Sequence, residues 1–160
     1  MKKILKLSLI AALCTCILLS FTGCGKNKKT ITADEFKSKM ENKGFTVQDS
    51  KLEYASRNDI VKSYLATEKS SKYQIDYFEL DSVSSAKSMY DRNVDVIEND
   101  AADSMIKSKV TTSIANYSWF ETEFEGKYMV ISRVENTLIC ASAKSNYKED
   151  IKTILNELGY

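Results

Sequence analysis

The side chains that could do chemistry in this sequence are thiols, carboxylates and amines, because the chain has four cysteines and no histidine. Histidine is the usual general base near neutral pH and the commonest metal ligand, so we expect no metal site and no cofactor. Cys24 follows the small residues Thr22 and Gly23, and a cysteine sulfur is a nucleophile. Cys140 lies in the apolar stretch 137–141 and is expected to be a small buried hydrophobic residue.

Residues 1–23 have the composition of an export signal. Lys2, Lys3 and Lys6 precede an apolar run at 7–21 that only three hydroxyl residues interrupt. A positive start, an apolar stretch of about 15 residues and a small-residue exit characterise secretory signal peptides. A membrane-spanning helix needs about 20 apolar residues, which is more than this run supplies. We therefore predict a signal peptide at 1–23 that is removed.

The sequence Phe21-Thr22-Gly23-Cys24 resembles the lipobox of bacterial lipoproteins, whose usual form is Leu, a small residue, Gly or Ala, and then Cys. Phe21 stands where Leu is preferred, and the other three residues fit. The resemblance implies diacylglycerol transfer to Cys24, cleavage between Gly23 and Cys24, and a lipid anchor at the extracytoplasmic face of the cell membrane, as in lipoproteins of Gram-positive bacteria. It covers residues 1–24 and leaves 25–160 without a family.

Removal of the signal peptide leaves the lipidated cysteine and a short basic tether at 24–30, followed by a single domain at 31–160. The whole chain has a net charge of +1, and loss of the three signal lysines makes the mature chain −2. Nucleic-acid-binding proteins carry a concentrated basic surface, so we expect no nucleic-acid partner. The expected partners are the membrane, through the lipid, and an unidentified ligand or protein of the envelope.

A candidate binding patch lies in the segment 116–124, which holds the only tryptophan. If this segment is a strand, four residues share one face, while Ser118, Phe120, Thr122 and Phe124 form a core-facing set. The first face would display aromatic and acidic side chains together, and aromatic residues are common at binding hot spots. The alternative is that the tryptophan packs under a loop or helix edge. The predicted patch consists of Tyr117, Trp119, Glu121 and Glu123.

The elements that must position this patch follow from hydrophobic periodicity and from turn and cap residues. We predict the order α-β-β-β-α-β-β-β-α, an α+β fold in which an antiparallel sheet of about six strands carries helices on one face. In each half a hairpin leads into a helix, so internal duplication is a further hypothesis. The predicted helices are 33–43, 83–100 and 147–158, with Asn146 and Glu149 capping the last; the predicted strands are 45–48, 60–67, 73–80, 108–124, 127–134 and 137–143.

Neither a catalytic nucleophile motif nor a phosphate-binding glycine loop occurs in the sequence. The spacing of Asp91, Asn93 and Asp95 is that of a calcium loop, but the loop's glycine and its final glutamate are missing. We therefore expect a membrane-anchored, non-catalytic binding or protein-interaction module at the cell envelope. The alternative is an envelope hydrolase that uses paired carboxylates.

Overall fold

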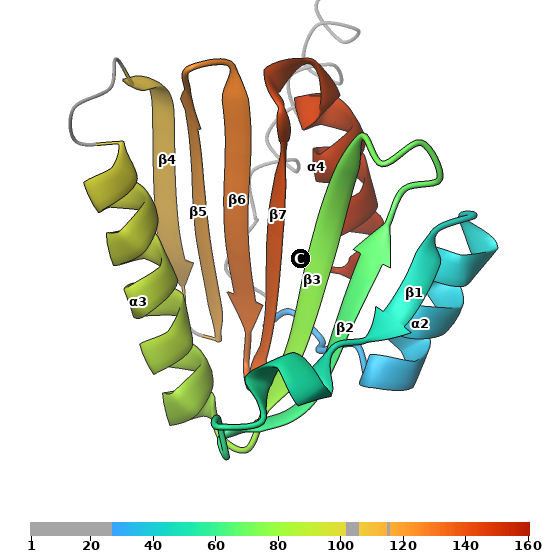
Figure 1. Ribbon diagram of the computed structural model, residues 1–160. Helices are drawn as coiled ribbons and strands as arrows, with labels where there is room; N and C mark the ends of the chain where they lie inside the picture. Colours follow the sequence, from blue (N-terminus) through green and yellow to red (C-terminus); the bar gives the residue numbers. More distant parts are fainter. Residues whose placement is uncertain (1–26, 102–105, 115) are drawn as a thin grey trace, which may run out of the picture.

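The computed structural model describes residues 27–101, 106–114 and 116–160 of the chain. The predicted signal peptide, the cleavage site and Cys24 lie outside these residues. In the described part, seven antiparallel strands form one sheet in the order β1-β2-β3-β7-β6-β5-β4 (Figure 1). The strands are β1 (Thr46–Asp49), β2 (Ile60–Thr67), β3 (Tyr73–Leu80), β4 (Ile106–Ile114), β5 (Tyr117–Phe124), β6 (Lys127–Val134) and β7 (Thr137–Lys144).

The predicted α+β class and antiparallel sheet are confirmed, with one strand more than the predicted six. The extra strand arises because the segment 108–124 folds back on itself at a turn that includes Asn116, which makes β4 and β5 a hairpin. A tight turn at Glu125–Gly126 connects β5 to β6. Both of its residues have positive φ (49° and 74°), as the favoured two-residue hairpin turns require.

In the described ranges, three α-helices flank the sheet: α2 (Ala33–Asn42), α3 (Val83–Asp100) and α4 (Lys148–Leu158). Thr32 caps α2 through a capping box with Glu35. For α4 the predicted cap is wrong, because Asn146 lies in a short 3₁₀ turn, η3 (Ser145–Tyr147), and no side chain caps the helix start. None of the helices among the described residues is both long enough and apolar enough to cross a bilayer.

The helices lie on both faces of the sheet, so the prediction that they share one face is wrong. Figure 1 shows α3 in front of the sheet and α4 behind it. The reason is that the central strands bury consecutive residues, whose side chains point to opposite faces of the sheet, such as Tyr77 and Phe78 of β3. Tyr77 belongs to the core beneath α2 and α4, and Phe78 belongs to the core beneath α3. A sheet that is apolar on both faces needs cover on both.

This placement also bears on the hypothesis of internal duplication. The central strands β3 and β7 are antiparallel neighbours. Two halves that meet there could be related only by a two-fold axis perpendicular to the sheet, and such an axis would put α3 and α4 on the same face. They lie on opposite faces, so the two hairpin-helix units are not symmetry mates.

Candidate functional site

Three of the four residues of the predicted patch line a cleft on the face covered by α2 and α4. The cleft has a volume of about 360 Å³ and lies between the β4–β5 hairpin and α4. We call it the aromatic cleft. Its floor comes from alternate residues of β4 and β5, and its wall comes from the exposed side of α4. The lining residues are Val110, Thr112, Tyr117, Trp119, Glu121, Lys152 and Asn156.

Trp119 is half-buried, so it is neither a fully displayed anchor nor a fully buried core residue. It packs against the core beneath α2 and α4 and also lines the aromatic cleft. Its partners across the sheet are the small residues Thr112 on β4 and Ser132 on β6. The Tyr117 ring is tilted by 37° to the indole at a centroid distance of 6.5 Å. The two rings therefore form an aromatic floor that a ligand can reach.

Glu121 is the charged centre of the cleft and is only 5 % exposed. Tyr128 Oη donates a hydrogen bond to Glu121 Oε2 at 2.9 Å, and Lys152 Nζ donates to Oε1 at 3.3 Å. A buried carboxylate needs such partners, because its desolvation costs several kcal/mol. Burial and the hydrogen bond to Glu121 raise the pKa of Tyr128, which therefore stays a donor. The three side chains fix a polar group beside the aromatic floor.

Glu123 shares the predicted face but does not belong to the cleft lining. Its carboxylate lies 3.8 Å from Lys148 Nζ, at the start of α4. Glu121 and Glu123 thus each contact a lysine of α4, and the two carboxylates do not converge on one cavity. The structure brings Tyr117, Trp119 and Glu121 together and leaves Glu123 apart from them.

Lys28 adds a contact to this cleft that the sequence interpretation missed, because it treated residues 24–30 as a tether. The backbone N–H of Lys28 donates to Asn116 Oδ1 at 3.2 Å, and Asn116 Nδ2 donates to the Lys28 carbonyl at 2.8 Å. The Lys28 ammonium lies 3.8 Å from the centroid of the Tyr117 ring, a cation–π contact, and its burial lowers its pKa. The start of the described chain is thereby fixed against the Tyr117 end of the cleft.

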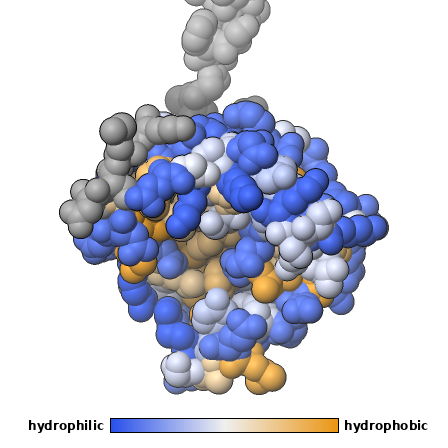
Figure 2. Space-filling model, turned by 45° about the horizontal axis from the view of Figure 1, so that its top comes forward, coloured by the Kyte–Doolittle hydropathy of each residue, from blue (hydrophilic) through white to orange (hydrophobic). Residues whose placement is uncertain are grey.

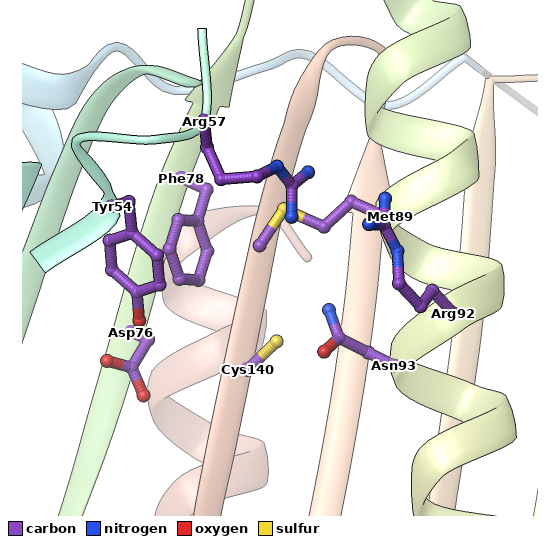
Figure 3. Close-up of a pocket in the computed structure, with 8 residues that line it drawn as sticks. All are labelled: Tyr54, Arg57, Asp76, Phe78, Met89, Arg92, Asn93 and Cys140. Atoms are coloured by element: carbon purple, nitrogen blue, oxygen red, sulfur yellow. The ribbon is translucent and has the colours of Figure 1, made fainter. Parts of the chain in front are cut away.

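A second cleft lies on the opposite face, where α3 leaves part of the sheet uncovered. It has a volume of about 260 Å³ and continues into an apolar cleft of about 220 Å³. We call the two together the α3 groove. A view from the side of α3, tilted so that the top comes forward, shows a hollow whose floor is apolar and whose rim is hydrophilic (Figure 2). The first part is lined by Tyr54, Arg57, Asp76, Phe78, Met89, Arg92, Asn93 and Cys140 (Figure 3).

Asp76 is the most perturbed carboxyl group of the α3 groove. Its burial, and next the charge of Glu53, raise its pKa from 3.8 to about 6, while a hydrogen bond from the Gln74 side chain opposes the shift. Its neighbour across the sheet is Cys140, which was predicted to be buried and is half-buried. Burial and the nearby Asp76 raise the pKa of the Cys140 thiol, so the thiol is protonated at neutral pH.

The α3 groove was not predicted from the sequence, because its lining comes from five separate elements: the short 3₁₀ helix η2 (Lys51–Tyr54), β3, α3, β6 and β7. One signal was present: Asp76 interrupts the apolar strand 73–80 at a position flanked by Ile75 and Tyr77. Within the described ranges no group of three or more Cys, Asp or Glu residues could hold a metal ion.

Comparison of the chain with protein-family models, with curated proteins and with solved structures found no match.

Proposed function

We propose that the protein is a lipid-anchored, extracytoplasmic binding module that holds an envelope ligand in its aromatic cleft. The observation that carries this proposal is the cleft itself, in which Tyr117 and Trp119 lie beside the buried and partnered Glu121. Ligand sites are typically concave, with apolar or aromatic walls and a few fixed polar groups. The anchor half of the proposal rests on the lipobox-like sequence at 21–24.

The contacts of Lys28 connect the two halves of the proposal. Lys28 is four residues beyond Cys24 and contacts both Asn116 and Tyr117. Four residues span at most about 14 Å, so a lipid on Cys24 would hold the Tyr117 end of the cleft close to the bilayer. Lys26, Lys28 and Lys29 would add attraction to anionic headgroups of about 1 kcal/mol each, to the extent that they reach the surface. A cleft in this position suits a ligand at the membrane surface.

The lining of the aromatic cleft favours a ligand with an apolar face and several hydroxyl or amide groups. The rings of Tyr117 and Trp119 offer a flat apolar floor, and Glu121, Lys152 and Asn156 offer acceptors and donors at its edge. Sugar rings combine C–H faces with hydroxyl groups in this way. The glycan portion of an envelope polymer is therefore the occupant that we propose.

Trp119 allows a direct test, because it is the only tryptophan of the chain and its fluorescence reports on the cleft. The full chain, purified in detergent, is titrated with soluble cell-wall glycan fragments. We expect a saturable change in emission. The apparent Kd should rise about tenfold in Glu121→Gln, because the amide lacks the negative charge that strengthens a hydrogen bond to the carboxylate. Asp91→Asn, an exposed carboxylate of α3, is the matched control and should bind like the wild type.

The fragments recovered from the titration are then analysed by mass spectrometry. Intact fragments with saturable binding support the module. Cleaved fragments would overturn it in favour of the hydrolase alternative, and an emission that does not respond to any glycan concentration would overturn the assignment of the ligand.

A further inference from the structure

The α3 groove has a cationic end, an acidic centre and an apolar end, in that order along the strands. Its two parts share Asp76, Asn93 and Cys140, so they are continuous. Phe78 lines only the first part, whereas Met129 lines only the second. Asp76 lies between them, because it is level with Cys140 of β7 and Ile131 of β6, and Phe78 and Met129 are each two residues away from that level in opposite directions. Rows of side chains on one face are roughly 7 Å apart, so the groove floor extends over roughly 14 Å.

The cationic end consists of Arg57 and Arg92, which come from opposite walls. Arg57 Nε and Nη2 donate to the carboxylate of Asp59 at 2.9 and 2.7 Å, which orients the guanidinium and leaves its other N–H groups free of that pair. Arg92 projects from α3, and Figure 3 shows the two guanidinium groups directed toward one another across the cleft. Two such groups suit a carboxylate, which accepts several N–H donors at once.

The centre of the α3 groove offers hydrogen-bonding groups in a half-buried setting. The charged or titratable groups around Asp76 are Glu53 and Tyr54 of η2, the two arginines, and the Cys140 thiol. Asn93 faces the centre from α3 (Figure 3). A carboxylate that has lost most of its water is stabilised by an N–H donor from a ligand.

The apolar end is formed by aliphatic side chains of α3 and of the sheet. Val96 and Ile97 of α3 lie on one side, Met129 of β6 forms the floor, and Ile131 of β6 adjoins it at the level of Asp76. Val96 is 53 % exposed, so an apolar group of a ligand would remove its surface from water, which favours binding.

We propose that the α3 groove binds a short apolar peptide, with its C-terminal carboxylate at Arg57 and Arg92, a backbone N–H at Asp76 and an apolar side chain over Met129. The length of the groove floor exceeds what one free amino acid covers and matches two extended residues with their side chains. This site is separate from the aromatic cleft and lies on the other face of the sheet.

The test is isothermal titration calorimetry of the full chain in detergent with three probes: leucyl-leucine, leucyl-leucinamide and free leucine. We expect saturable binding of leucyl-leucine, and about tenfold weaker binding of the amide, which lacks the carboxylate that the arginines would hold. Free leucine should also bind more weakly, because it leaves the apolar end empty. Equal affinity for the dipeptide and its amide, equal affinity for leucine, or no binding of the dipeptide would each overturn the proposal.

Variants locate the site. Arg92→Gln should weaken leucyl-leucine binding about tenfold, whereas Lys87→Gln, which removes another exposed cation of α3 that lies outside the groove, should leave it unchanged. Ser142→Trp places a large side chain at an exposed position of the apolar end and should block binding without loss of the fold, which circular dichroism checks. Unchanged binding in both Arg92→Gln and Ser142→Trp would overturn the proposal. Glu121→Gln should bind the dipeptide normally, which separates this result from the test of the aromatic cleft.

Discussion

Replacement of Asp76 by asparagine should change how the stability of the protein depends on pH. In the folded chain, burial and Glu53 raise the pKa of Asp76 from 3.8 to about 6. Between these two pH values the folded state binds more protons than the unfolded state, so wild-type stability falls as pH rises through this window. The stabilisation that comes from protonated Asp76 is fully present below about pH 4, and it is lost once the pH exceeds about 6 and the carboxyl group ionises.

The size of the effect follows from the shift. One pKa unit corresponds to 1.36 kcal/mol, so a shift of about two units costs the wild type about 3 kcal/mol of stability at pH 8 relative to pH 4. Asparagine has nearly the same shape and does not titrate. Asp76→Asn should therefore match the protonated wild type near pH 4 and exceed the wild type by up to about 3 kcal/mol at pH 8.

Urea unfolding followed by the fluorescence of Trp119, at a series of pH values from 4 to 8, measures this difference. Asp91→Asn removes an exposed carboxylate from α3 and controls for the change in net charge. Parallel stability profiles of Asp76→Asn and the wild type across the whole pH range would refute the assignment of a buried, destabilised charge to Asp76.

Three further changes have defined outcomes. Cys24→Ala should abolish acyl labelling and release the protein from the membrane fraction; labelling that persists would remove the lipoprotein assignment. Trp119→Ala should cost about 1–3 kcal/mol in thermal unfolding followed by circular dichroism, less than the loss of a fully buried aromatic residue, because Trp119 is only half-buried; a loss of 4 kcal/mol or more would mean a core residue. Thr32→Ala removes the capping box of α2 and should cost about 1 kcal/mol in the same measurement, and an unchanged melting temperature would contradict the role of that cap.

Local patterns predicted the elements that they encode directly. The strands at Ile60–Thr67 and Tyr73–Leu80 and the helix Val83–Asp100 have the bounds predicted from periodicity and cap residues. The division of 108–124 into β4 and β5 was missed, since the segment before Tyr117 lacks the glycine that marks the next hairpin. The cap of α4 was misassigned because Asn146 and Glu149 have capping spacing, whereas the chain forms a 3₁₀ turn there.

The sequence by itself determined that Tyr117, Trp119 and Glu121 share a face, because side chains alternate along any strand. It could not determine what covers that face, since the answer lies in α4, some thirty residues further on, which supplies Lys152 to the aromatic cleft. The α3 groove is wholly a product of tertiary structure. Its cationic end joins Arg57 from the segment after η2 with Arg92 from α3, and only the packing of α3 on the sheet brings the two guanidinium groups together. Periodicity is a property of neighbouring residues, but a cleft depends on the distances between elements that are remote in the chain.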